Sequence, residues 1–173
     1  YDKFVRYGER VLRRTSRDYA PWYVVEGVDH YYRSLTVGRI LLEGLQAALA
    51  NPQRTQLQPH AAPLVSSLDN RGLLASLDMT QALSKDDYKE QLATEQARLS
   101  GLMRDKRMRK HALIAAFEGN DAAGKGGAIR RVTGALDPRQ YRIVPVAAPT
   151  EEERAQPYLW RFWRHIPARG KFT

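Results

Sequence analysis

Apolar residues recur at three- and four-residue spacing over much of the chain, with polar residues between them. This periodicity predicts amphipathic helices. The expected helices cover residues 1–18, 29–49, 84–110, 125–136 and 150–166. Residues that often cap helices stand at three of the expected starts, namely Asp29, Ser84 and Thr150. Glu153 gives the last of them the spacing of a capping box, so the sequence predicts where these helices begin.

Three shorter runs of apolar, aromatic and β-branched residues have the composition of buried strands. They are residues 20–25, 112–117 and 141–146. The last two flank an expected helix, and the order strand, helix, strand predicts a right-handed crossover within a parallel sheet. Residues 51–75 lose the periodicity and collect turn-forming residues, so they are interpreted as a linker. We therefore expect an α/β fold.

A glycine-rich turn follows the run 112–117 and leads into the next helix. Gly119, Gly124 and Lys125 have the G-x4-G-K spacing of a Walker A loop, in the strand–turn–helix context that this motif requires. Glycines let backbone N–H groups point inward, the helix start adds a positive dipole end, and Lys125 adds a mobile charge. We expect Lys125 to be catalytic. The expected phosphate-binding residues of the loop are Gly119, Asn120, Ala122, Ala123, Gly124, Gly126 and Gly127.

Gly126 occupies the position at which the common motif has a Ser or Thr that binds magnesium. The metal then needs another oxygen, and Asp121 inside the loop is the expected Mg²⁺ ligand and second catalytic residue. One alternative is that Asp121 only caps the helix or shapes the turn. The alternative for the whole segment is a glycine-rich turn without function.

Cationic residues outside the loop are secondary candidates for phosphate contacts. Arg130 lies early in the helix after the loop, and Arg139 lies in a predicted turn after that helix. The basic run 104–110 is interpreted either as a landing strip for a polyanion or as a solvated helix end, and we favour the second interpretation. Trp160 and Trp163 are interpreted as core residues rather than as base-stacking platforms.

The loop and the segments after it resemble the polyphosphate kinase 2 family over residues 83–170. The resemblance implies a P-loop kinase-like three-layer sandwich with a parallel sheet, incomplete in this chain. It also implies Mg²⁺-dependent phosphoryl transfer between inorganic polyphosphate and a nucleotide. The family's Walker B and lid residues would lie beyond Thr173, so the chain is expected to be inactive alone. The matching segments are Gly119–Gly127, Leu136–Arg139, Pro149–Glu153 and Tyr158–Arg161.

Residues 1–50 resemble the opposite end of the same kind of domain, through Ala20–Val25 and Asp29-x-x-Tyr32-Arg33. His30 departs from the family's Asp-Lys pair. An end that precedes a beginning implies two fused copies, as in the polyphosphate:AMP phosphotransferase type, so AMP is the expected acceptor and ADP the expected product. The expected division is 1–50 as the helical end of a first domain, 51–75 as linker, and 76–173 as the start of a second P-loop kinase domain.

The formal net charge of +9 and a pI near 10.0 favour a polyanionic partner. The absence of cysteine excludes disulfides and thiolate metal sites, and four scattered His give zinc little support. There is no apolar run of membrane-spanning length, so no membrane partner is expected and the chain is interpreted as a soluble cytoplasmic protein.

Other functions fit parts of the sequence. A small-molecule P-loop kinase using ATP would share the loop, although Gly126 departs from its usual motif. Nucleic acid would suit the charge, but no recognised nucleic-acid-binding motif is present. A non-catalytic fragment that binds a polyanion or another protein is a further alternative, and a homo-oligomer is compatible with the sequence.

Overall fold

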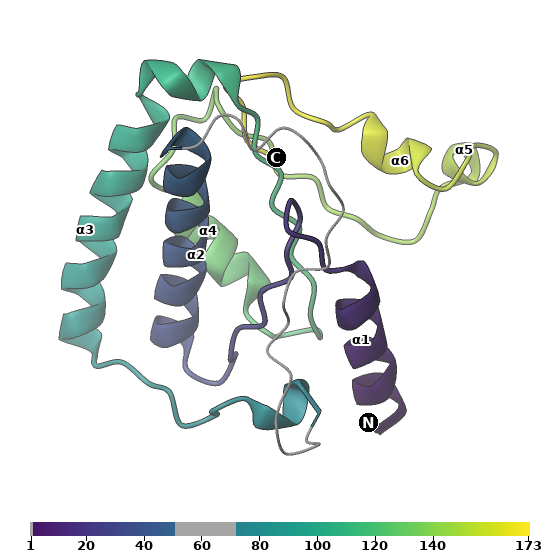
Figure 1. Ribbon diagram of the computed structural model, residues 1–173, viewed down its shortest axis with the longest axis horizontal. Coiled ribbons are helices and arrows are strands. Elements are labelled where there is room, and N and C mark those ends of the chain that lie inside the picture. The colour runs from purple at the N-terminus through teal and green to yellow at the C-terminus, as the bar shows by residue number, and fades with distance from the viewer. Residues whose placement is uncertain (1, 51–71) are drawn as a thin grey trace.

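The computed structural model describes residues 2–50 and 72–173. Its centre is formed by three helices, α2 (His30–Ala50), α3 (Lys85–Met103) and α4 (Lys125–Thr133), with α2 packed against both others (Figure 1). Most of the expected linker, residues 51–75, lies outside the described residues. At its end Leu74–Ser76 form the 3₁₀ turn η2.

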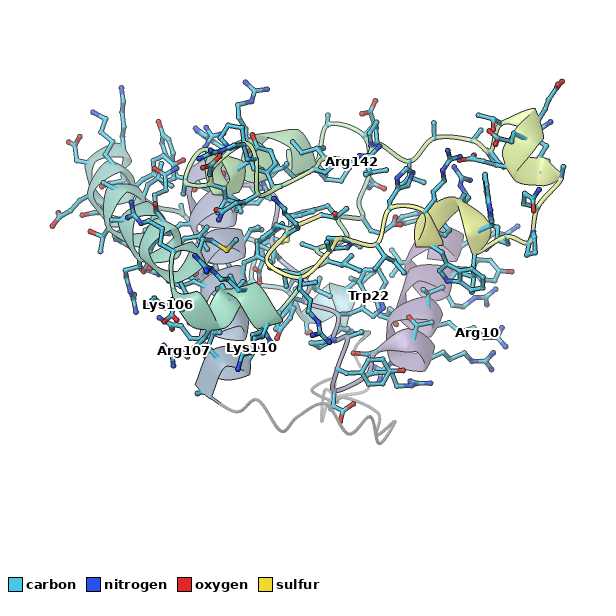
Figure 2. The ribbon with its side chains drawn as sticks, turned by 90° about the horizontal axis from the view of Figure 1, so that it is seen from above. Arg10, Trp22, Lys106, Arg107, Lys110 and Arg142 are labelled. Carbon is cyan, nitrogen blue, oxygen red and sulfur yellow. The ribbon has the colours of Figure 1, made fainter. Side chains whose placement is uncertain are left out.

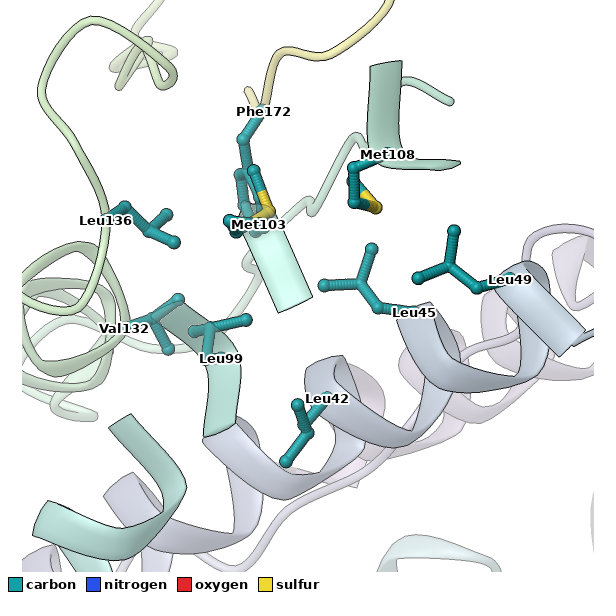
Figure 3. Close-up of a cluster of buried hydrophobic side chains, with 9 residues drawn as sticks. All are labelled: Leu42, Leu45, Leu49, Leu99, Met103, Met108, Val132, Leu136 and Phe172. Carbon is teal, nitrogen blue, oxygen red and sulfur yellow. The ribbon is translucent and has the colours of Figure 1, made fainter. Parts of the chain in front are cut away.

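The hydrophobic core lies where these helices meet the segments around them (Figure 3). Each helix contributes apolar side chains from the stripe that its periodicity predicts, and Met108, Leu136 and Phe172, which lie outside these three helices, complete the cluster. Burial of these side chains removes apolar area from water and is the main source of stability. The members are Leu42, Leu45, Leu49, Leu99, Met103, Met108, Val132, Leu136 and Phe172.

The predicted helix starts are confirmed by their caps. Asp29 Oδ1 accepts a hydrogen bond from the Tyr32 N–H at 2.6 Å, just before α2 begins. Ser84 Oγ accepts from the Asp87 N–H at 3.1 Å at the start of α3. Thr150 and Glu153 form the complete capping box of the short helix α5 (Glu151–Arg154). Each cap satisfies an N–H group that its helix leaves unpaired.

Two helix ends differ from the prediction. The helix expected to reach residue 110 ends at Met103, and a separate 3₁₀ turn, η3, covers Lys106–Lys110. Asp105 causes the break, because its side chain accepts from the Arg107 N–H and its backbone is extended. The helix expected to reach residue 136 ends at Thr133, with Gly134 at its C-cap. Leu136 nevertheless packs in the core.

The expected strands are wrong as regular elements within the described residues, where only isolated bridges occur. Leu113 and Tyr141 each form a parallel bridge to Phe172, so residues 171–173 lie between the two expected strands. The bridging hydrogen bonds include Ala115 N–H to Thr173 O at 2.8 Å and Arg142 N–H to Phe172 O at 2.9 Å.

The run 112–117 was also expected to be a buried strand, and it is buried only in part. Leu113, Ala115 and Phe117 are partly buried, whereas the residues between them are exposed, including Ile114 at 58%. This alternation is typical of an extended segment with one covered face. The helices α2, α3 and α4 therefore cover one side of the bridged segments.

The expected strand 20–25 is not formed either. Ala20 makes an antiparallel bridge with Arg17, which closes a tight turn after the helix α1 (Asp2–Thr15). Pro21 then follows, and it has no N–H group to donate to a ladder. No other described segment pairs with residues 20–25, so these residues form an irregular connection to α2.

The long helix expected from Thr150 is two single turns, α5 and α6 (Trp160–Trp163), because Pro157 cannot continue the helix that α5 starts. These turns lie apart from the three central helices (Figure 1). The apolar stripe is therefore uncovered, with Tyr158 at 70%, Trp163 at 58% and Ile166 at 60% exposure. Trp163 is accordingly not the core residue that the sequence suggests.

Two exposed acidic turns give a pH prediction. The pKa of Asp105 is lowered from 3.8 to about 2 by hydrogen bonds from the Arg107 side chain and N–H. The pKa of Asp137 is lowered to about 2 in the same way by Arg139. Because both folded-state pKa values are depressed, the stabilisation is complete above pH 3.8 and lost as the pH falls through 2. We expect NMR titration midpoints near 2, which Arg107→Met and Arg139→Met should return toward 3.8.

Candidate phosphate-binding site

The glycine-rich turn after residues 112–117 has the backbone geometry that its glycines predict. Gly119 has φ +155° and Gly124 has φ +79°, both in the region where a side chain is disfavoured. Ala122 has φ +59°, and for a residue with a β-carbon this left-handed conformation costs about 1–2 kcal/mol. Strain of this kind is retained where the surrounding structure requires it, commonly at functional sites.

The helix α4 begins directly at the end of this turn. Gly124 is its N-cap and offers no side-chain oxygen, so the N–H groups of the first turn have no acceptor within the helix or at a capping side chain. The helix dipole places partial positive charge at the same point. The turn and the helix start together form a backbone site suited to an anion.

Lys125 folds back over the turn. Its Nζ donates to the carbonyl oxygens of Gly119 at 2.8 Å and Asn120 at 2.6 Å. The ammonium group is thus held across the two ends of the loop, where a phosphate could replace the carbonyl oxygens as its acceptor. Lys125 is only partly exposed, so its charge is less screened than that of a surface lysine.

Asp121 is exposed at the tip of the turn, where Oδ1 accepts from the Ala122 N–H at 3.0 Å. It therefore shapes the turn through one oxygen, as one of the sequence alternatives supposes. No group of three or more His, Asp or Glu that could hold a metal occurs in the described residues. Mg²⁺ commonly binds through one or two carboxylates together with substrate phosphates, so a single loop carboxylate fits this metal.

The structure separates the predicted arginines. Arg130 lies exposed on α4, one turn beyond the loop. Arg139 lies before Tyr141, at the amino end of the bridged segments, whereas the loop follows their carboxyl end. Its Nη2 donates to Asp137 at 2.7 Å. The structure does not bring Arg139 to the loop, so its predicted phosphate contact gains no support from this placement.

The basic run also lies away from the loop. Lys106, Arg107 and Lys110 gather on η3, whereas Arg10 lies on α1 at another side of the molecule (Figure 2). Because η3 directly precedes residues 112–117, it belongs to the amino end of the bridged segments. This placement gives no support to a polyanion contact shared with the loop. The alternative, a solvated helix end, holds only in part, because α3 ends at Met103 and the run continues in the separate turn η3.

Sequence reasoning missed one neighbour of the loop. Arg33, in the first turn of α2, packs against Gly124, and Gly27 lies beside the Ala123 carbonyl. The pair 33 and 124 is far apart in the sequence, and no local pattern joins them. The only signal was that Arg33 belongs to one of the segments that carry the family resemblance.

Comparison with known proteins places these residues in a family. The family model described as Polyphosphate kinase 2 matches residues 82–173. A polyphosphate:AMP phosphotransferase of Pseudomonas aeruginosa is 82% identical over all 173 residues, and the chain covers 35% of its length. The protein of the same name from Pseudomonas syringae is 70% identical, again with 35% of its length covered.

A solved structure shows the same relationship. The chain matches a crystal structure described as a candidate polyphosphate kinase 2 from Pseudomonas aeruginosa PA01 with a TM-score of 0.58 and 75% identity. The match covers 100% of this chain and 34% of that one. The chain thus spans about a third of the length of the relatives it matches. None of its described helices has the length and apolar character needed to cross a bilayer.

Proposed function

The chain belongs to the polyphosphate kinase 2 family, and on this premise we propose that its loop serves Mg²⁺-dependent phosphoryl transfer between inorganic polyphosphate and AMP. The observation that carries the proposal is the loop from Gly119 to Lys125, with its positive φ angles, uncapped helix start and inward lysine. The printed names of the two Pseudomonas relatives support AMP as the acceptor. In the forward reaction an AMP phosphate oxygen attacks the terminal phosphorus of polyphosphate, which releases a chain shortened by one phosphate and forms ADP.

The finer architecture is part of the same proposal. We propose a P-loop kinase-like three-layer sandwich, in which α2, α3 and α4 form one of the helical layers. The parallel bridges of Leu113 and Tyr141 to Phe172 support a parallel sheet beneath them. The division at residues 51–75 between the end of one kinase-like copy and the start of another is likewise a proposal, although α2 shares its core with α3 and α4.

For phosphoryl transfer the protein mainly aligns the reacting phosphates and places positive charge around the transferred group. The N–H groups at the start of α4 bind phosphate oxygens, and the Lys125 ammonium neutralises charge that builds up on the transferred group. Asp121 is the residue that would hold Mg²⁺, which would supply further charge neutralisation when bound. Because Lys125 is only partly exposed to solvent, its charge interacts more strongly with phosphate than the charge of a fully exposed lysine.

The test uses a chimera in which these 173 residues replace the matching segment of the Pseudomonas aeruginosa relative. Long-chain polyphosphate and Mg²⁺ are supplied with AMP, ADP or GDP in separate reactions. We expect turnover that prefers AMP. Transfer only from ATP to a non-nucleotide acceptor would instead identify a small-molecule P-loop kinase. Binding of polyphosphate by the chimera without any transfer would support the non-catalytic alternative.

Asp121→Asn tests the metal site within this chimera. The amide keeps the size of the side chain but loses its charge, so we expect turnover to fall by about 10²-fold and the Mg²⁺ concentration for half-maximal rate to rise. Asp86→Asn, at an exposed carboxylate in the first turn of α3, is the matched control and should change neither quantity. An Mg²⁺ dependence of Asp121→Asn equal to that of the parent would leave Asp121 with only its role in the turn.

A further inference from the structure

Arg33 lies against the phosphate loop in an unusual way. It comes from the first turn of α2, and a β-carbon on Gly124 would overlap its Cζ, Nη2 and Nε atoms. Its remaining nitrogen, Nη1, donates to the Gly27 carbonyl at 2.6 Å. Nη1 is thus fixed to the backbone before α2. Because the β-carbon would lie no farther from Cζ than from Nη2, the flat face of the guanidinium lies on Gly124, the residue from which α4 starts.

The guanidinium that lies on Gly124 is not fully paired. Nε of Arg33 is buried and makes no hydrogen bond, and none of the ion pairs within residues 2–50 and 72–173 includes Arg33. A buried donor without an acceptor destabilises a fold, and more so when it is charged. Such a group is expected where a ligand completes its hydrogen bonds, and the Nε–Nη2 edge of arginine matches two phosphate oxygens.

Resting on the proposed function, we propose that Arg33 is a second phosphate-binding cation of the loop. Its guanidinium, which lies on Gly124, binds an oligophosphate together with Lys125 and the N–H groups at the start of α4. The glycine at 124 is required for this arrangement, because any side chain there would occupy the space of the guanidinium. Arg33, which comes before the expected linker 51–75, thereby contributes to a phosphate site formed by residues that come after that linker.

The competing explanation is that Arg33 only packs. It could join Gly27 to the loop, since a β-carbon at Gly27 would lie 3.7 Å from the Ala123 carbonyl oxygen. A packing role requires the shape of the side chain but not its charge or its fork of donors. Substitutions that separate shape, charge and fork therefore distinguish the two roles.

The test measures tripolyphosphate binding to the 173-residue chain by calorimetry at several salt concentrations. Arg33→Met keeps much of the packing but loses charge and fork, so we expect about 10- to 100-fold weaker affinity and a shallower dependence on salt. Arg33→Lys keeps the charge but loses the fork, so we expect an intermediate loss with the original salt dependence. Near-ultraviolet circular dichroism of the tryptophans checks that each variant is folded.

Arg39→Met is the matched control on the same helix. Arg39 donates to Gln91 at 2.7 Å and pairs with Glu95 at 3.4 Å on α3, away from the loop. Its loss should leave tripolyphosphate affinity unchanged. A folded Arg33→Met that binds as tightly as the parent overturns the proposal. If that variant does not fold, Arg33→Lys decides, because parental affinity in it would show that the fork has no role.

Failure of this inference can be told apart from failure of the proposed function. Lys125→Ala is measured beside the Arg33 variants. If it weakens tripolyphosphate binding and Arg33→Met does not, Arg33 only packs and the loop remains the phosphate site. If Lys125→Ala leaves binding unchanged, the loop is not the phosphate site and the proposed function fails first.

Discussion

Lys125→Ala is expected to lower the turnover of the chimera with polyphosphate and AMP by about 10³-fold, with little change in stability. The Lys125 ammonium donates to two backbone carbonyls of the loop turn, with acceptors at 2.8 and 2.6 Å. Its removal withdraws charge from the place where negative charge develops in the transition state. Steady-state rates at saturating Mg²⁺ measure the effect.

The control for this substitution is Lys89→Ala. Lys89 is an exposed lysine of α3 that pairs weakly with Asp86 at 3.7 Å, so its loss removes the same charge at a distance from the loop. We expect its turnover to match that of the parent. A Lys125→Ala chimera that retains more than about a tenth of parental turnover would contradict a role for this lysine in the transition state.

Gly124→Ala is expected to abolish turnover and to destabilise the loop. The φ of +79° costs a residue with a β-carbon about 1–2 kcal/mol, and the added methyl group would also displace the Arg33 guanidinium. The loop must then open or α4 must start differently, and either change removes the aligned N–H groups. Turnover of the chimera and thermal unfolding of the chain measure the two effects.

Gly101→Ala is the matched control for that change. Gly101 lies inside α3 at ordinary φ, and a β-carbon there would meet nothing within 4 Å. Alanine should stabilise the helix by about 0.5–1 kcal/mol and leave turnover unchanged. If Gly124→Ala behaved as Gly101→Ala does, the loop would not need the conformation described for it.

Local sequence signals predicted the parts of the fold that depend on neighbouring residues. The caps at Asp29, Ser84 and Thr150 involve partners within three residues, so their chemistry can be seen in the sequence. The loop was predictable for the same reason, since Gly119, Gly124 and Lys125 define their own turn. Its place at the start of α4 followed from helical spacing.

The features of the fold that the sequence did not predict depend on competition between interactions. The break in the basic run at Asp105 arises because its carboxylate binds the Arg107 N–H in preference to continued helix. The apolar periodicity up to Ile166 predicted one continuous helix. Pro157 cannot continue a helix, and the structure has two separate turns instead. Apolar composition predicted strands at 112–117 and 141–146, but ladders need pairing partners, which composition does not reveal.

The contact between Arg33 and Gly124 shows the same limit for the site. It forms because α2 packs against α4 through the shared core, which sets the first turn of α2 beside the loop. Nothing within either segment alone indicates that packing. A positively charged residue in a family-like segment was a signal, but its partner came only from the fold.

The place where tripolyphosphate binds on the chain decides whether the glycine-rich loop is the phosphate site. Backbone amide shifts are followed by ¹⁵N NMR during a titration with tripolyphosphate and Mg²⁺. We expect saturable shifts concentrated at residues 119–127, which Lys125→Ala suppresses, with small changes on η3 at Lys106–Lys110. Shifts confined to η3, with residues 119–127 unchanged, would contradict the claim that this loop is the phosphate site.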